Sequence, residues 1–175
     1  DHRDLHRVDR RQRQMCIRDR EKGVKMSKES TLVLIKPDGV NRGIIGKVIE
    51  RLESTGLKIV GIKLILIDEN LASNHYDEHK DKPFFSSLVS FITSSPVVAI
   101  ALKGEYAIQK TRTMMGATNP LESEPGTIRG DFGLTVEKNI IHGSANEKDA
   151  KRELGLYFNN NELLDYSRSI DEWTE

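Results

Sequence analysis

The segment PVVAIAL at residues 96–102 constrains the fold most, because every position after its proline is apolar. An uninterrupted apolar run of this length is typical of a strand that is covered on both faces. Alternation of apolar and polar residues is typical of a strand with one face exposed to solvent. A strand of this kind lies in a sheet that has helices packed on its faces. We therefore expect an α/β (α+β) protein in which residues 96–102 form a buried strand.

Three other segments have the character of strands. TLVLIK at 31–36 is a short β-rich run that stops at the turn tripeptide Pro-Asp-Gly. LKIVGIKLILI at 57–67 is a longer run in which Gly61 predicts a bulge, and FGLTV at 132–136 is expected to be the last strand. In the longer run, one face is expected to carry Val60, Ile62, Leu64 and Leu66.

Apolar residues at helical spacing fill the gaps between these strands. Residues 44–53 show this spacing, and Gly56 marks the end of the helix that they predict. The pattern from 68 to 93 is also helical but contains Pro83, which predicts two short helices. Further helices are expected at 105–116, 147–157 and 162–166. Residues 117–131 form a long loop, and loops of this length in compact domains usually carry function.

Four strands therefore alternate with helices along the chain. Two arrangements fit this order: a doubly wound parallel sheet, or the split ferredoxin-like βαββαβ core with additional helices. The small number of strands and their moderate length favour the ferredoxin-like core.

The first 25 residues differ in composition from the rest of the chain. They carry nine basic and five acidic residues without apolar periodicity, which is typical of a segment that does not collapse on its own. We expect residues 1–25 to be a disordered or non-native extension and residues 26–175 to be the folded domain. That domain carries 18 basic and 22 acidic residues, so a nucleic-acid partner is not expected.

The cysteine content and the length of the apolar runs indicate in which cellular compartment the protein is expected. Cys16 is the only cysteine of the chain, so the sequence contains neither a disulfide framework nor a cysteine zinc site. The longest apolar runs, residues 64–67 and 97–102, are far too short to cross a membrane. We therefore expect a soluble, cytoplasmic protein with no membrane partner.

Polar residues gather at strand ends and in the long loop, where packing does not require them. Lys36 ends the first strand, Arg112 lies on the helix expected at 105–116, and Arg129 lies in the loop. Singly, each cation fits a solvated surface; together with a threonine hydroxyl they suit phosphate groups, if the loop folds back over the sheet. The full set is Lys36, Tyr76, His79, Arg112, Thr118, Arg129, Asn139, His142 and Ser144.

His142 lies in the segment NIIHGS, behind an apolar pair and before a Gly-Ser turn. A histidine with an ordinary pKa of about 6.5 keeps a free lone pair near neutral pH, so it can be a base, a metal ligand or a nucleophile. The sequence lacks the Gly-x-Ser-x-Gly elbow and a Walker A loop, and His75 with His79 offers only a weak zinc site. The nucleophile remains, and its attack on a γ-phosphoryl group would form a phosphoramidate with high transfer potential.

Several motifs together resemble the nucleoside diphosphate kinase family. They are IKPDGV at 35–40, HYDEHKDKPFF at 75–85, TNP at 118–120, PGTIRGDF at 125–132 and NIIHGS at 139–144. The resemblance implies a ferredoxin-like, four-stranded antiparallel sheet with helices on its faces and a long loop over the active site. It also implies ping-pong transfer of a γ-phosphoryl group between nucleoside tri- and diphosphates in a homo-oligomer, usually a hexamer. Mg²⁺ would be held mainly by the nucleotide phosphates, without a protein ligand.

The resemblance also implies roles for single residues. His142 would be phosphorylated, and Ser144 and Glu153 would orient its ring. Phe84 would stack on the base with Val136 opposite, and such stacking is indifferent to base identity. The phosphates would be held by His79, Arg112, Thr118 and Arg129. Lining the site would be Lys36, Tyr76 and Asn139, of which Lys36 and Asn139 would also reach the sugar.

One position departs from the family pattern. An aspartate that positions the metal through water usually follows His-Gly-Ser, and here Ala145 takes its place. This departure supports a second hypothesis, in which the chain is a catalytically weakened member that serves as a binding or scaffolding protein. The sequence also leaves open whether Phe84 or Phe85 faces the ligand, and which ring nitrogen of His142 is attacked.

Overall fold

Residues 28–174 are described by a computed structural model, and their four strands form one sheet in the order β2-β3-β1-β4. The strands are β1 (Glu29–Ile35), β2 (Lys58–Ile65), β3 (Val97–Gly104) and β4 (Ile141–Gly143). β1 pairs antiparallel with β3 and β4, and β2 pairs antiparallel with β3. The ferredoxin-like arrangement is therefore confirmed, and the doubly wound parallel sheet is excluded. The extension predicted at residues 1–25 lies outside the described residues.

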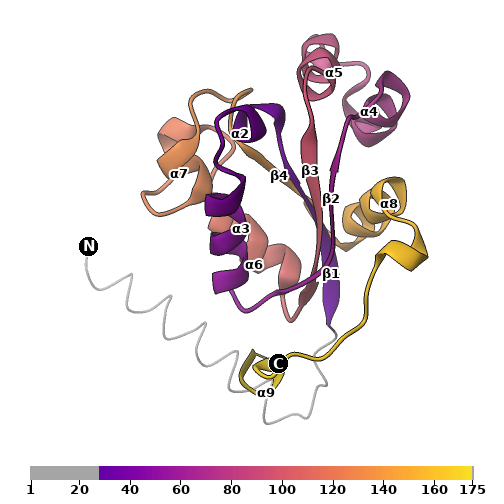
Figure 1. Cartoon of the computed structure of the whole chain (residues 1–175). Coiled ribbons are helices and arrows are strands. Elements are labelled where there is room, and N and C mark those ends of the chain that lie inside the picture. The colour runs from indigo at the N-terminus through magenta and orange to yellow at the C-terminus, as the bar shows by residue number, and fades with distance from the viewer. Residues whose placement is uncertain (1–27, 175) are drawn as a thin grey trace.

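Helices occupy the connections between the strands (Figure 1). The α-helices are α2 (Pro37–Asn41), α3 (Ile45–Ser54), α4 (Glu69–His75), α5 (Phe85–Thr93), α6 (Ala107–Met115), α7 (Ile128–Phe132), α8 (Glu147–Tyr157) and α9 (Asp171–Thr174). Short 3₁₀ helices are η1 (Asp77–His79), η2 (Pro120–Glu122) and η3 (Asn160–Glu162). Within residues 28–174, no helix has both the length and the apolar character that crossing a membrane requires.

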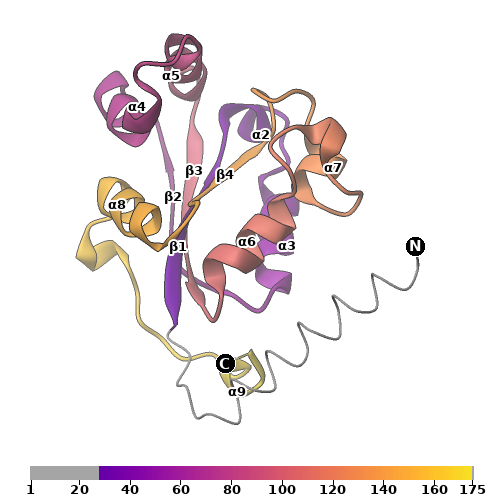
Figure 2. The same ribbon diagram turned by 180° about the vertical axis from the view of Figure 1, so that it is seen from behind.

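Each face of the sheet has its own apolar core. α3 and α6 cover one face, and α4, α5 and α8 cover the other, as the two opposite views show (Figures 1 and 2). β3 serves both cores because its side chains alternate between the faces. Ile100 belongs to the first core and Ala99 and Ala101 to the second, and all three are fully buried. The prediction that residues 96–102 form a strand covered on both faces is confirmed.

The predicted bulge in the second strand is present. The pairing of β2 with β3 shifts by one residue at Val60, just before Gly61. Val60 is buried, whereas Ile62 and Leu64 are 49% and 61% exposed. The prediction that Val60 shares a face with the apolar residues after it is therefore wrong, because one extra residue reverses the alternation of the faces.

The prediction of a last strand at 132–136 is wrong. Leu134 N–H donates to the Lys138 carbonyl at 2.9 Å, which closes a local turn. Local bonds of this kind satisfy backbone groups that a strand would otherwise pair across a sheet. The last strand is β4, in which His142 lies opposite Leu34 of β1. The place beside β1 is thus taken by the histidine segment itself.

The helix predicted at 162–166 is also wrong, because this segment runs along β2. Leu164 N–H donates to the Val60 carbonyl at 2.7 Å, and the Tyr166 hydroxyl donates to the Ile59 carbonyl at 2.7 Å. β2 lies at the edge of the sheet, and the bulge interrupts its ladder on the other side. The C-terminal segment therefore satisfies polar groups by pairing with this edge instead of forming a helix.

Candidate active site

The backbone before His142 is bent, and two polar contacts hold the bend. Ile140 has a φ of 71°, in the left-handed region that β-branched residues rarely adopt. Its N–H donates to Asp38 Oδ2 at 3.0 Å, and its carbonyl accepts from the Lys36 N–H at 2.8 Å. The bend ends the preceding segment and begins β4, so His142 lies on the edge strand and in the wall of a cavity.

This cavity has a volume of about 610 Å³, which is within the size range of small-molecule sites. Nearly all of the residues predicted for the site lie in its wall. They are Lys36, Tyr76, His79, Phe84, Arg112, Thr118, Arg129, Val136, Asn139, His142 and Glu153. Ser144 is fully buried and reaches the site through a hydrogen bond to Glu153. Residues that are distant in the sequence therefore converge on one cavity.

Glu153 contacts the His142 ring on its Nε2 side. Both of its carboxylate oxygens lie 3.2 Å from Nε2, and Ser144 Oγ donates to the same carboxylate at 2.6 Å. Burial raises the pKa of Glu153, but the hydrogen bonds from His142 and Ser144 outweigh burial and bring the pKa to about 2. A carboxylate only accepts, so Nε2 carries the hydrogen and a neutral ring has its lone pair on Nδ1. Nδ1 forms no hydrogen bond with any described residue, which leaves it available as a nucleophile.

Three cations line the cavity without an acidic partner. Among the described residues, no salt bridge involves Lys36, Arg112 or Arg129. Burial lowers the pKa of Lys36 to about 8. Burial, followed by repulsion from Arg112, lowers the pKa of Arg129 to about 10. Both shifts indicate that the cavity holds its positive charges at a cost, which a ligand with several negative charges would offset.

Hydrogen bonds hold the long loop over the cavity. Asn139 Nδ2 donates to the Thr118 carbonyl at 2.8 Å, which joins the start of the loop to the histidine segment. The guanidinium of Arg129 donates to the carbonyls of Gly116 at 3.0 Å and Ile141 at 2.9 Å. Both ends of the loop are therefore tied to the strand that carries the histidine, as folding back over the sheet requires.

The loop predicted at 117–131 is partly helical. Asn119 caps η2 by accepting from the Leu121 N–H, and Thr127 Oγ1 caps α7 by accepting from the Gly130 N–H at 3.1 Å. These side chains satisfy backbone donors that a short helix leaves open. Arg129 therefore lies in the first turn of α7 and not, as the sequence had predicted, in irregular backbone. The hydrogen bonds of the helix hold its backbone in place.

Two apolar side chains lie in an exposed part of the cavity wall. Phe84 and Val136 line it and are 50% and 55% exposed. Phe85 instead packs against the core on the α4 and α5 side of the sheet. Phe84 is therefore the phenylalanine that lines the cavity. One side of its ring contacts the His79 ring, with the centroids 5.7 Å apart, and its exposed part can stack on a planar group.

Two aromatic rings form a deeper part of the wall. Tyr76 and His79 stack with their centroids 6.4 Å apart and an interplanar angle of 26°. Burial raises the pKa of Tyr76, so its hydroxyl stays protonated and can donate to a ligand.

Sequence reasoning missed several residues of the cavity wall, and Asp149 and Glu137 are two that make polar contacts. Asp149 lies in the wall, four residues before Glu153 on α8, so helical spacing from Glu153 could have revealed it. Glu137 accepts a hydrogen bond from Lys36 Nζ at 2.6 Å through its main-chain carbonyl. Every residue has a main-chain carbonyl, so the residue type at position 137 gives no indication of this contact. Only the structure shows it.

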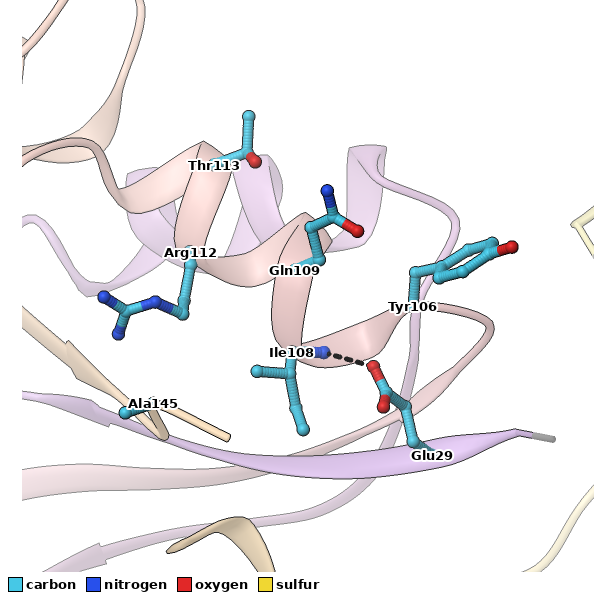
Figure 3. A pocket seen from close by; sticks show the side chains of 7 residues that line it. All are labelled: Glu29, Tyr106, Ile108, Gln109, Arg112, Thr113 and Ala145. Carbon is cyan, nitrogen blue, oxygen red and sulfur yellow. Dashed lines mark hydrogen bonds between the residues drawn. The ribbon is translucent and has the colours of Figure 1, made fainter. Parts of the chain in front are cut away.

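A second and more open cavity of about 520 Å³ shares Arg112 and Ala145 with the first. Figure 3 shows the side chains from α6 and from the residue just before it that line this cavity, among them Tyr106, Ile108, Gln109 and Thr113. Across from them, the Glu29 carboxylate accepts from the Ile108 N–H at 2.9 Å. In this view, Arg112 points away from Glu29. The departure from the family pattern at Ala145 therefore lies where two cavities meet.

Known proteins resemble this chain in sequence and in structure. The family model described as nucleoside diphosphate kinase matches residues 29–163. A nucleoside diphosphate kinase of Archaeoglobus fulgidus is 52% identical over 145 residues, which cover 83% of this chain and 96% of that protein. The structure of a Halobacterium salinarum nucleoside diphosphate kinase in complex with CDP has a TM-score of 0.83 and 50% identity, and the match covers 85% of this chain and 99% of that one.

A further similar structure is that of a relative with a mimic of the transition state. A nucleoside-diphosphate kinase of Borrelia burgdorferi, described as a transition state mimic with bound vanadate and ADP, has a TM-score of 0.81 and 40% identity. That match covers 86% of this chain and 98% of the other. With a family model that spans most of the chain and relatives of this identity, the chain belongs to the nucleoside diphosphate kinase family.

Proposed function

We propose that the chain transfers the γ-phosphoryl group of a nucleoside triphosphate to a nucleoside diphosphate by a ping-pong mechanism in which His142 is transiently phosphorylated. Its family makes the chain a phosphotransferase. One observation supports His142 as the carrier: its free Nδ1 lies in the same cavity as three cations without acidic partners. The hypothesis of a weakened scaffolding member is less well supported, because the nucleophile, its orienting carboxylate and the cations lie together.

The proposed chemistry consists of two mirrored half-reactions. Nδ1 of His142 attacks the γ-phosphorus, the bond between this phosphorus and the bridging oxygen breaks, and a nucleoside diphosphate leaves. Glu153 keeps its bond to Nε2–H and stabilises the positive charge that the ring gains on attack. A second diphosphate then takes the phosphoryl group back from Nδ1. The cations stabilise the charge on the phosphate oxygens in both directions.

The base is proposed to lie in the exposed part of the cavity, between Phe84 and Val136. Stacking on an aromatic ring contributes about 1–3 kcal/mol per base and does not depend on which base is present. Neither side chain offers a hydrogen bond that would select one base. The site is therefore expected to accept purine and pyrimidine nucleotides alike.

Labelled ATP tests the proposed mechanism directly. After incubation with ATP labelled in the γ-phosphate, the protein is expected to carry label that is lost in acid and kept in base, as phosphohistidine is. Addition of GDP is then expected to move the label to GTP. Label that survives acid, or transfer that proceeds without a labelled protein, would contradict the proposal.

Mg²⁺ is proposed to enter with the nucleotide phosphates. It prefers oxygen ligands and keeps several waters, and the cavity offers the Asp149 carboxylate for an outer contact. Asp149 Oδ2 accepts from Asn146 Nδ2 at 2.7 Å, and Oδ1 has no hydrogen-bond partner among the described residues. We propose that Asp149 provides, through water, the contact that Ala145 cannot. The bound ion would neutralise phosphate charge and orient the γ-phosphoryl group.

Substitutions at Asp149 and Ala145 are expected to change the Mg²⁺ concentration that ADP binding requires in opposite directions. Asp149→Asn should raise the Mg²⁺ concentration needed for half-maximal ADP binding by up to about tenfold, and Ala145→Asp should lower it. Calorimetric titration of ADP at a series of Mg²⁺ concentrations measures both effects. Glu147→Gln is the matched control, because Glu147 lies in the same helical turn, is exposed and is not part of the cavity wall. Equal Mg²⁺ dependence in all four proteins would refute the role of Asp149.

The affinity for ADP is expected to fall above about pH 8. Lys36 is charged below its pKa of about 8 and neutral above it, and bound phosphate raises this pKa because it favours the charged form. The dissociation constant should therefore be constant at lower pH and then rise by up to about tenfold per pH unit, until the pKa of the complex is reached. Calorimetry across this range measures the rise, and Lys36→Gln should bind weakly without it. A rise of the same size in the variant would assign the effect to another group.

We also propose that the chain forms a homo-oligomer, as the resemblance implies. Ile62, Leu64 and Leu66 are 49%, 61% and 70% exposed, and they lie in or just after the edge strand β2. The C-terminal segment covers this edge at Ile59 and Val60, and the apolar side chains after the bulge stay exposed, as in a patch at which chains associate. Leu64→Lys is therefore expected to produce smaller species, as measured by light scattering. A wild-type chain that is monomeric at the same concentration would contradict this proposal.

A further inference from the structure

His75 is buried beside the nucleophile, and neither of its ring nitrogens has a hydrogen-bond partner among the described residues. It is the last residue of α4 and is 2% exposed. Its ring lies edge-on to the His142 ring, with the centroids 4.6 Å apart, and edge-on to Tyr157 at 5.4 Å. A buried polar group without a hydrogen-bond partner destabilises the folded state, so an apolar ring of similar shape would be more stable at this position.

Three potential ligand atoms converge at this point. One ring nitrogen of His75, one of His142 and a carboxylate oxygen of Glu153 all lie within 4.8 Å of one another. Two imidazoles and one carboxylate are a donor set of zinc enzymes, in which water completes the tetrahedral coordination. His142 is partly exposed to the nucleotide cavity, which provides a path for an ion and room for the water.

The protonation states of these groups favour metal binding at neutral pH. Burial, followed by the neighbouring His142, lowers the pKa of His75 to about 3, so its ring is uncharged. Despite its burial, Glu153 has a pKa of about 2, because His142 and Ser144 donate to it. Neutral imidazole and ionised carboxylate are the forms that bind a metal ion.

We propose that Zn²⁺ binds the nucleotide-free enzyme between His75, His142 and Glu153, and that it blocks phosphoryl transfer. Mg²⁺ does not compete for this site, because it prefers oxygen ligands and octahedral geometry. The site differs from the pair that the sequence indicates: His79 lies at the end of η1 and does not belong to the cluster. His75 instead pairs with the histidine of the active site.

Zn²⁺ would block phosphoryl transfer because the imidazole ring has only one lone pair to donate. This step rests on the proposed function. A neutral imidazole carries one hydrogen and one lone pair. In this structure Nε2 of His142 faces Glu153, so a metal ion in the cluster takes the lone pair of Nε2 and the hydrogen moves to Nδ1. Nδ1 then has no lone pair for attack on phosphorus.

Cobalt binding without nucleotide tests the site independently of catalysis. Co²⁺ replaces Zn²⁺ as a coloured probe, and the full chain is expected to bind it in excess Mg²⁺ with the absorption of a tetrahedral site. His75→Phe keeps the ring contacts, loses no hydrogen bond and removes one ligand. Its affinity for Co²⁺ is expected to fall at least tenfold, since even loss of an outer-shell partner costs about 10–100-fold. Equal affinity in both proteins would overturn the proposal.

Two features make this comparison sharp. His2, His6 and Cys16 lie outside the described residues, but they are present in both proteins, so their contribution cancels in the difference. His79→Phe is the matched control, because it removes a histidine of the same cavity that is not in the cluster. It is expected to leave Co²⁺ affinity within about twofold, and an equal loss in this variant would contradict the assignment of His75.

X-ray absorption of the zinc-bound wild-type protein keeps the test decisive if His75→Phe fails to fold. Two imidazoles in the shell of the ion are expected, and fewer than two would overturn the site. Formation of the phosphoenzyme then tests the block: Zn²⁺ added before ATP should reduce it in the wild type and much less in His75→Phe. Zinc that is bound by two imidazoles without slowing phosphorylation would refute the block, whereas absence of phosphorylation without zinc would count against the proposed function instead.

Discussion

Replacement of His142 by alanine is expected to lower transfer from ATP to GDP by at least about 10⁴-fold, while ADP affinity changes by less than about threefold. The substitution removes the atom that is proposed to form the bond to phosphorus. It leaves the three cations that would hold the phosphates, because the hydrogen bonds of Lys36 and Arg129 go to main-chain carbonyls and no hydrogen bond joins Arg112 to the imidazole. The substitution should therefore lower the rate of transfer without lowering the affinity for ADP.

Turnover, ADP calorimetry and mapping of the labelled peptide measure this separation. Alanine also removes one of the two side chains that form a hydrogen bond with the buried Glu153, so a loss of folding must be distinguished from a loss of chemistry. His142→Gln serves this purpose, because its amide can still donate to the carboxylate but cannot carry a phosphoryl group. Both variants should bind ADP and show no phosphoenzyme. Transfer between two different nucleotides in either variant would refute the mechanism.

The fold was largely predictable because its central strand has an unambiguous pattern. Residues 96–102 are apolar on both faces, and this pattern determines the two layers of helices. The run at 132–136 has similar β-rich character, but hydrogen bonds within the loop satisfy its backbone. The three residues of β4 carry too short a pattern to compete with it in the sequence. Strand propensity is local, whereas pairing with β1 depends on the bend at Ile140.

The sequence indicated which residues gather around the cavity, but it did not indicate their geometry. Motif context indicated the cations and the histidine, and the structure places them around one cavity. The sequence could not show that Nε2 of His142 faces Glu153, because this depends on how α8 packs against β1 and β4. It also could not show the environment of His75, since a buried unpaired histidine and a solvated one have the same letter. Such contacts arise only from tertiary packing.

Glu153→Gln is expected to lower the rate of His142 phosphorylation by about 10²–10⁴-fold with little change in ADP affinity. The carboxylate is 4% exposed and accepts from both Nε2 and Ser144 Oγ. Glutamine removes the negative charge that stabilises the ring as it becomes positive. Its amide can also donate to Nε2, and a ring that accepts at Nε2 carries its hydrogen on Nδ1, where the lone pair is needed.

Single-turnover measurement of phosphoenzyme formation separates this effect from nucleotide binding. Glu147→Gln is the matched control, because it makes the same change on the same helix at an exposed residue outside the cavity wall. It should phosphorylate at the wild-type rate. If Glu153 only supported the fold, its variant would lose thermal stability and ADP affinity together with rate. A rate within about threefold of wild type would show that the ring is oriented by other contacts, and the proposed role of the carboxylate in holding Nδ1 free would fail.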